Sequence, residues 1–362
     1  MQESARYHRR IAALRNEFRS LKLDAFMTSA LPTMQYLCGY SGSNGLLIVD
    51  NRSTHFFTDF RYQEYIQSAV TADAKIIGKG SLAQVAAKKG LFSSFKKIAI
   101  EQDRMTLAEF VFLKKIISPG KFVLTSGIVE QLRVVKDHWE TVALKRAFAI
   151  SDRVFHQLLG VIKPGMNELE ISAEISSLHK KNGAENDAFD VIVASGVRGS
   201  LPHGTATEKK IHPGEFITLD FGCIFGGYHS DMTRTICVGK PSAEMKKVYR
   251  TVLESQQKAC DAVRSGIPAK SLDRIARQHI AAKGYGKYFG HSLGHGVGLE
   301  IHEMPRIAPK SKDILEAGNV ITIEPGIYLP GRFGVRIEDT VIVTAKGSEV
   351  LTRSPKELIT IE

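Results

Sequence analysis

The sequence predicts two successive domains, an α/β domain over residues 1–133 and an α+β domain over residues 134–362. The chain is 362 residues long, which is more than one compact core usually serves. Short apolar runs alternate with helical patterns in the first 130 or so residues, whereas long helical patterns and strand-rich regions are separated in the remainder. Apolar residues make up 43% of the chain and charged residues 24%, which is typical of folded globular proteins and excludes disorder.

Helices and strands alternate along the first domain. Apolar residues at helical spacing predict an amphipathic helix over residues 5–22. Strand-like runs follow at residues 24–29, 45–50, 54–59 and 97–101. Helical patterns occupy residues 81–90 and 106–116, and Thr106 with Glu109 forms a capping box at the start of the second. This order indicates an α/β domain in which no catalytic residues are concentrated.

Two pairs of helices and two strand-rich regions make up the second domain. The helical patterns fall at residues 138–162, 167–181, 242–264 and 269–283. Asn167 and Glu170 form a capping box at the start of the second of these helices. Residues 187–238 and 319–343 are rich in Ile, Val, Thr and Phe, which predicts strands. The separation of helices from strands indicates an α+β domain.

Composition excludes several classes of function. The net charge of +11 is compatible with a nucleic-acid or anionic-membrane partner, but the basic residues are scattered and form no dense block, so we expect neither partner. No apolar run is long enough to span a bilayer, and the first residues resemble no secretion signal, so we expect a cytoplasmic protein. The four cysteines form no CxxC pair, which predicts buried thiols rather than disulfides or zinc ligands.

The second domain contains two similar halves that carry acidic residues at matching places. The segment GEFITLDFG, which contains Asp220, resembles GNVITIEPG, which contains Glu324, position by position. A second acidic segment follows in each half, with Asp231 in SDMTRTICV and Glu338 in IEDTVIV. Two such halves indicate a duplication folded around a pseudo-twofold axis.

Carboxylates in strands of this kind need partners. Side chains alternate between the two faces of a strand, so Asp220 shares a face with Thr218 and lies opposite Leu219. Four carboxylates on one sheet face would repel one another, and burial would raise their pKa values. Divalent cations would neutralise them; the alternative is four acids that are paired separately. Oxygen-rich ligands favour Mn²⁺, with Co²⁺, Zn²⁺ or Fe²⁺ as alternatives, and two such ions can support peptide hydrolysis.

A histidine-rich stretch, YFGHSLGHGVGLEIHEMP, offers nitrogen ligands. It contains His291, His295 and His302 among glycines, and His203 lies in SLPHG. A phosphate-binding loop is not indicated, because no helical pattern follows GHGVG. The zincin motif HExxH is absent as well, because Ser292 follows His291. Four histidines in loops beside an acidic sheet indicate a functional site rather than a core feature.

Five motifs in this order carry a resemblance: LDFG, SDMTRT, GHGVGLEIHE, TIEPGIY and VRIEDT. The chain resembles the pita-bread metallopeptidases of the creatinase and methionine aminopeptidase superfamily. It is most similar to the proline-specific branch, which comprises Xaa-Pro aminopeptidase (aminopeptidase P) and Xaa-Pro dipeptidase (prolidase). The resemblance extends over the whole chain, and it implies a creatinase-like N-terminal domain followed by a pita-bread catalytic domain.

The resemblance implies a dinuclear metal site. The ligands that it implies are Asp220, Asp231, His295, Glu324 and Glu338. Asp231 and Glu338 would bridge both metals, and Asp220 would complete the first ion. His295 and Glu324 would complete the second ion. The implied cofactor is therefore a pair of divalent ions, for which we expect Mn²⁺.

The resemblance also implies roles in catalysis and substrate binding. Glu324 corresponds to the general base. His203 and His302 correspond to histidines that contact the scissile carbonyl, the intermediate and the leaving nitrogen. His291 corresponds to a histidine of the proline subsite, and Arg336 to an arginine near the metal carboxylates, which we group with the substrate-binding residues. A surface position in its strand is the alternative for Arg336.

We therefore expect a hydrolase that acts on proline-containing peptides and forms a homodimer. Our first expectation is an Xaa-Pro aminopeptidase that cleaves before proline at the N-terminus of peptides, and the alternative is an Xaa-Pro dipeptidase. Methionine aminopeptidase is disfavoured by the additional N-terminal domain and by His291. A non-catalytic pita-bread binding protein is disfavoured by the complete ligand set. The sequence leaves open the peptide length, the residue preferred before proline and the physiological metal.

Overall fold

The computed structural model describes residues 2–362, and the chain divides into two compact units, one ending at Arg133 and the other beginning at Val134. The first unit is α/β and the second is α+β, as the sequence predicts. No helix within the described residues combines the length and the apolar character that crossing a membrane requires.

The first unit is built on a mixed six-stranded sheet. Its strands, in spatial order, are β4 (Ala74–Ile77), β3 (Thr54–Thr58), β2 (Gly45–Asp50), β1 (Ala25–Thr28), β5 (Ile98–Glu101) and β6 (Phe122–Thr125). Its main helices are α1 (Gln2–Leu21), α2 (Leu31–Cys38), α3 (Tyr65–Ala69), α4 (Leu82–Lys88) and α5 (Leu107–Ile116), and α6 (Ile128–Val134) follows. Our sequence analysis did not predict the edge strands β4 and β6. Both are four-residue strands whose side chains are incompletely buried. Lys75 interrupts the apolar run of β4, whereas the apolar run of β6 was overlooked.

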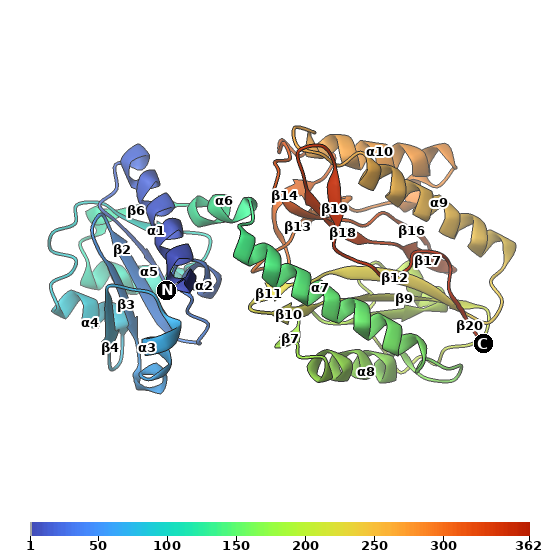
Figure 1. Ribbon diagram of the computed structural model, residues 1–362, viewed down its shortest axis with the longest axis horizontal. Coiled ribbons are helices and arrows are strands. Elements are labelled where there is room, and N and C mark those ends of the chain that lie inside the picture. Colours follow the sequence, from blue (N-terminus) through green and yellow to red (C-terminus); the bar gives the residue numbers. More distant parts are fainter. Residues whose placement is uncertain (1) are drawn as a thin grey trace. The chain divides into compact units, whose positions relative to one another are not determined.

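Two helix pairs enclose the strands of the second unit (Figure 1). The helices are α7 (His138–Leu159), α8 (Glu168–Lys181), α9 (Ala243–Asp261) and α10 (Ala269–Ala282). The capping box predicted at Asn167 and Glu170 is present at the start of α8. One apolar cluster joins α7 and α8 to the strands, and another joins α9 and α10 to them. The four predicted helices are therefore confirmed.

Two main sheets lie between these helix pairs. The first has the order β20 (Thr360–Ile361), β12 (Met232–Val238), β9 (Glu215–Phe221) and β8 (Ile192–Ser195). The second has the order β14 (Glu303–Ile307), β13 (Gly294–Gly296), β15 (Val320–Ile323), β18 (Asp339–Val343) and β19 (Ser348–Val350). Smaller sheets are formed by β16 (Gly326–Leu329) with β17 (Phe333–Arg336), and by β11 (Tyr228–His229), β10 (Cys223–Phe225) and β7 (Asn186–Asp187).

The apolar residues at alternate positions of the strands pack into the two cores, as predicted. Ile217, Leu219 and Phe221 of β9 belong to the cluster under α7 and α8. Ile321 and Ile323 of β15 belong to the cluster under α9 and α10. The polar side chains of these strands therefore point away from the two cores, which leaves room for the acids between the sheets. All four cysteines are free and buried, as predicted.

Gly222 joins β9 to β10 where the backbone of Ser230 approaches closely. A Cβ atom at Gly222 would lie 1.8 Å from the Ser230 carbonyl oxygen, so an added methyl group must displace backbone. We predict that Gly222→Ala lowers the free energy of unfolding by about 1–3 kcal/mol. Gly347→Ala is the control, because a Cβ at Gly347 meets open space. Equal denaturation midpoints for the two variants would contradict this prediction.

Candidate metal centre

Four carboxylates lie at strand ends in the two main sheets. Asp220 is near the end of β9, and Asp231 immediately precedes β12. Glu324 immediately follows β15, and Glu338 immediately precedes β18. Only 9% of Asp220, 5% of Asp231 and 1% of Glu338 is exposed, so three of the four acids are buried. Each half of the predicted duplication contributes two acids to this region.

Hydrogen bonds join the two sheets beside these acids. The Glu338 amide donates to the Thr233 carbonyl over 3.1 Å, and the Thr233 hydroxyl donates to Glu338 Oε2 over 2.7 Å. The Thr340 hydroxyl donates to the Asp231 carbonyl over 3.2 Å. The backbones that carry Asp231 and Glu338 are therefore fixed to each other before any ligand binds.

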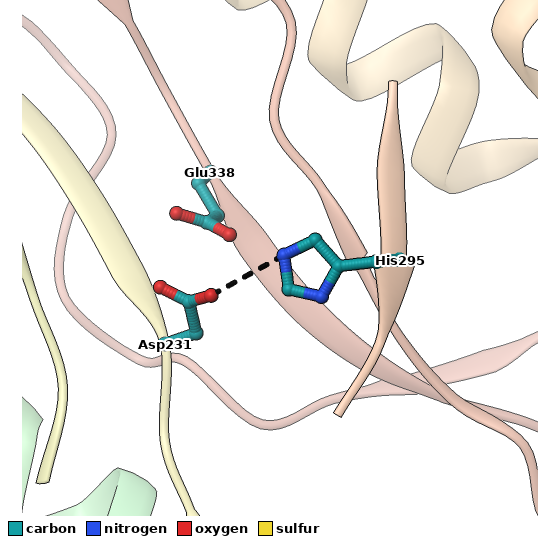
Figure 2. Close-up of side chains that lie close together, drawn as sticks. All are labelled: Asp231, His295 and Glu338. Atoms are coloured by element: carbon teal, nitrogen blue, oxygen red, sulfur yellow. Dashed lines mark ion pairs between the residues drawn. The ribbon is translucent and has the colours of Figure 1, made fainter. Parts of the chain in front are cut away.

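His295 faces the acids from β13. Its Nδ1 donates to the Gly296 carbonyl over 3.0 Å, which leaves Nε2 as the free ring nitrogen. Nε2 lies 3.5 Å from Asp231 Oδ2 and 3.4 Å from Glu324 Oε1. Figure 2 shows the side chains of His295, Asp231 and Glu338 pointing toward one another. One ligand atom from each of these three residues lies within 4.8 Å of the others, a grouping that could hold a metal ion.

Arg336 is a buried partner of this cluster rather than a surface residue of its strand. Its Nη2 donates to Asp220 Oδ2 over 2.5 Å, and its Nε donates to the Thr233 hydroxyl over 3.1 Å. Its Nη1 donates to the Tyr328 hydroxyl over 2.8 Å and to the Pro202 carbonyl over 3.1 Å. Four hydrogen bonds inside the protein leave the guanidinium little capacity for a substrate.

His291 is held by the same network. Its Nδ1 donates to the Ser292 carbonyl over 2.8 Å, and its Nε2 lies 2.9 Å from the Tyr328 hydroxyl. Burial and the charge of Arg336 lower the pKa of His291 to about 4, so the ring is neutral and accepts the Tyr328 proton. Because both ring nitrogens are engaged, His291 presents an uncharged ring surface next to Phe289, whose ring centroid is 5.1 Å away.

The two remaining predicted histidines lie at the edge of the site. The His302 ring centroid is 4.4 Å from that of His295 in an edge-to-face arrangement. Burial, Arg306 and His203 all lower the pKa of His302. His203 also contributes to the lowered pKa of His291, and its own side chain is exposed. The structure therefore brings all nine predicted site residues into one region of the second unit.

Sequence comparison identifies two matching families. Residues 142–345 match metallopeptidase family M24, and residues 10–135 match the creatinase/prolidase N-terminal domain. The chain belongs to metallopeptidase family M24. The resemblance inferred from the five motifs is confirmed, and so are the creatinase-like and pita-bread domains that it implied.

Relatives of this M24 peptidase match over nearly its whole length. The Xaa-Pro dipeptidase of Pyrococcus horikoshii is 38% identical over 339 residues, which are 93% of this chain and 95% of the relative. The structure of Xaa-Pro dipeptidase from Bacillus anthracis is 42% identical with a TM-score of 0.95, and the match covers 98% of this chain and 100% of that one. The structure of X-Pro aminopeptidase from Thermotoga maritima is 38% identical with a TM-score of 0.90, and the match covers 95% of this chain and 99% of that one. The prediction of a metal-dependent hydrolase is thereby confirmed.

The residues of this M24 peptidase fit divalent metal ions. Burial raises the pKa of Asp231 well above its ordinary value, and repulsion by Glu338 raises it further. Burial and repulsion by Asp220 raise the pKa of Glu338 to about 8. Asp220 Oδ1 and Glu338 Oε1 are buried and accept no hydrogen bond within the described residues. Oxygen atoms that are buried, mutually repulsive and unpartnered are the ligands expected of hard divalent cations.

Two residues of this network were missed in the sequence analysis. Tyr328 connects Arg336 to His291, and Thr233 connects Arg336 to Glu338. Both could have been found from alternation along their strands. In GIYL, Tyr328 points opposite to Ile327 and Leu329, whose side chains lie in the core.

Arg336 is the cation that offsets part of the negative charge of the four acids. Within the described residues, no other Arg or Lys side chain forms an ion pair with the four acids. We predict that Arg336→Met lowers the unfolding free energy of chelator-treated protein by about 3 kcal/mol, because it leaves Asp220 buried and unpaired. Denaturant unfolding with and without added Mn²⁺ measures the change, and the metal should recover part of the loss.

Arg332→Met is the matched control. Arg332 lies in the turn between β16 and β17, and its exposed side chain pairs with Glu244 on the surface. Such a pair contributes less than about 1 kcal/mol. A loss for Arg336→Met no larger than that of the control would show that the guanidinium does not offset the buried charge.

Proposed function

We propose that this M24 peptidase is a dinuclear Xaa-Pro dipeptidase. The observation that carries the proposal is the convergence of four acids and His295 from both halves of the catalytic unit. The names of its relatives support activity at Xaa-Pro bonds, and they favour the dipeptidase over the aminopeptidase, which was our first expectation from the sequence. We further propose that residues 1–133 form the creatinase-like domain and residues 134–362 the catalytic domain.

Five residues would hold the metals, for which Mn²⁺ remains our proposal. Asp231 and Glu338 are fixed to each other by inter-sheet hydrogen bonds and suit a bridging role. Asp220 keeps Oδ1 free while Arg336 occupies Oδ2, so it offers one oxygen. His295 Nε2 and Glu324 lie side by side and suit the second ion. When bound, the ions would lower the pKa of water and polarise the scissile carbonyl.

The remaining residues act on the peptide and its protons. Glu324 would take up a proton from water as the general base. Before any metal ion binds, burial and the charge of Glu338 raise the pKa of this carboxyl group. The Thr322 hydroxyl donates to Glu324 Oε1 over 3.4 Å and orients that carboxylate. His203 and His302, at the edge of the site, would donate hydrogen bonds to the scissile carbonyl and the leaving nitrogen.

Proline recognition would use the uncharged surface of His291. Proline has no N–H and a fixed φ, so the subsite needs an apolar ring contact rather than an acceptor for an amide proton. His291 and Phe289 provide adjacent ring surfaces. Arg336, which our sequence analysis grouped with the substrate-binding residues, would instead orient Asp220 and Tyr328 through its hydrogen bonds.

Metal content tests the ligand assignment. We predict that the protein binds two Mn²⁺ per chain and that Asp231→Ala reduces this number and abolishes Xaa-Pro hydrolysis. Elemental analysis after dialysis and a peptidase assay measure both quantities. Asp261→Ala, at the exposed end of α9, is the control and should retain metal and activity. Two tightly bound ions in Asp231→Ala would refute the bridging role.

Peptide length tests the proposed specificity. We predict that Ala-Pro is cleaved in the presence of Mn²⁺, whereas Ala-Pro-Ala is not, with mass spectrometry as the measurement. Release of alanine from the tripeptide at a comparable rate would favour the aminopeptidase instead. Cleavage of Ala-Ala with no preference for proline would overturn the Xaa-Pro assignment as a whole.

A further inference from the structure

We propose that Glu168 is a positioning residue that fixes the loop of residues 196–206 and thereby places His203. The inference rests on the proposed function, because it takes His203 to contact the peptide. Within the described residues, the exposed His203 ring forms no hydrogen bond of its own. Its position therefore depends on the backbone that carries it.

A single buried carboxylate joins the two ends of this loop. Glu168 is the first residue of α8 and has no exposed surface. Its Oε1 accepts hydrogen bonds from the Ser195 amide over 2.7 Å and from the Ser195 hydroxyl over 2.8 Å. Its Oε2 accepts from the Thr207 amide over 3.1 Å and from the Thr207 hydroxyl over 2.8 Å. Ser195 precedes the loop and Thr207 follows it, so Glu168 closes the loop at its base.

Arg198 adds a contact within the loop and balances the charge. Its Nε donates to Glu168 Oε2 over 2.9 Å, and its Nη2 donates to the Thr205 carbonyl. The Arg198 side chain is 23% exposed, whereas that of Glu168 is fully buried. Burying a carboxylate away from water is costly. The five hydrogen bonds that Glu168 accepts offset this cost, since hydrogen bonds to a charged acceptor are about twice as strong as neutral ones.

The loop is also held from the side of the metal centre. Arg336 donates to the carbonyl of Pro202, the residue before His203, over 3.1 Å. Gly199 packs against Gly334 of β17 so closely that a Cβ atom on Gly334 would lie 1.9 Å from the Gly199 carbonyl oxygen. Glu168 thus fixes the base of the loop, and β17 fixes its inner side.

A neutral amide cannot replace this carboxylate. In Glu168→Gln, the amide NH₂ group would face donors that now point at a carboxylate oxygen, either those of Ser195 or those of Arg198 and Thr207. The Ser195 and Thr207 hydroxyls can turn to accept from this NH₂ group, but a backbone amide cannot, so at least one hydrogen bond would be lost at one end of the loop. The expected result is a displaced His203 on an otherwise intact fold.

A kinetic double-mutant cycle tests the proposal on the metal-loaded full chain. We predict that Glu168→Gln lowers kcat for Ala-Pro by about 10–100-fold, the size of effect expected from a misplaced catalytic group. In a His203→Ala background, Glu168→Gln should cost no more than about two-fold further, because its effect acts through His203. Losses that multiply in the double variant, or an unchanged kcat for Glu168→Gln, would overturn the proposal.

Glu170→Gln is the matched control. It changes an exposed carboxylate two residues further along α8, whose hydrogen bond within the described residues is to the Asn167 amide at the start of the helix. It should leave kcat and metal content unchanged. If Glu168→Gln does not fold, Arg198→Met and Arg198→Lys replace it. The lysine variant should retain more activity than the methionine variant, and equal activities would count against the proposal.

Hydrogen exchange separates this proposal from the proposed function. In Glu168→Gln, amide exchange should accelerate within residues 196–206 and remain unchanged in α9 and α10. This readout does not need turnover, so a protein that cleaves no Xaa-Pro peptide would refute the proposed function but leave the loop assignment supported. Unchanged exchange in residues 196–206 would refute the role of Glu168, whatever the activity.

Discussion

The mutual repulsion of four acids between two sheets is the constraint on which the catalytic unit depends. Asp220, Asp231 and Glu338 are buried, and burial raises the pKa of Asp231, Glu324 and Glu338. One guanidinium, that of Arg336, neutralises one of four charges. The rest of the structure prevents the acids from separating, because hydrogen bonds between the sheets fix the backbone beside each bridging candidate. The architecture therefore preserves an acid-rich site that divalent cations would complete.

The neighbouring residues Glu338 and Asp339 show how a site differs from a structural ion pair. Both are buried and adjacent in the chain. Burial alone would raise the pKa of Asp339, but Arg234 and Lys356 lower it below its ordinary value. Its oxygens accept hydrogen bonds from Arg234 over 2.9 Å and from Gln256 over 3.0 Å, whereas Glu338 Oε1 accepts none. An acid satisfied by its surroundings stabilises the fold, and an acid left unsatisfied needs a ligand.

The sequence could predict what depends on local pattern. Helical spacing and the capping box at Asn167 gave α8 its correct start, and strand alternation placed Asp220 opposite Leu219. Partners distant in the chain came only from the family resemblance, which placed Arg336 near the metal carboxylates. Nothing in the sequence indicates that Arg336 also donates to the Pro202 carbonyl, more than 100 residues away. The edge strand β4 was missed because its four residues are incompletely buried and include Lys75, so they form no continuous apolar run.

Ion pairs with at least one buried member hold the segments that carry His291 and His302. Arg277 pairs with Asp273 and donates to the His291 carbonyl over 2.8 Å. Lys136 pairs over 3.0 Å with Glu303, which follows His302 directly. Such pairs contribute little net stability, since desolvation offsets most of their attraction, but breaking one leaves a buried charge uncompensated. They suit loops that must keep one conformation, because a displaced loop would separate the pair. The histidines are thus kept in place by the cost of leaving a buried charge unpaired, which is also the cost that makes the four acids of the metal centre require cations.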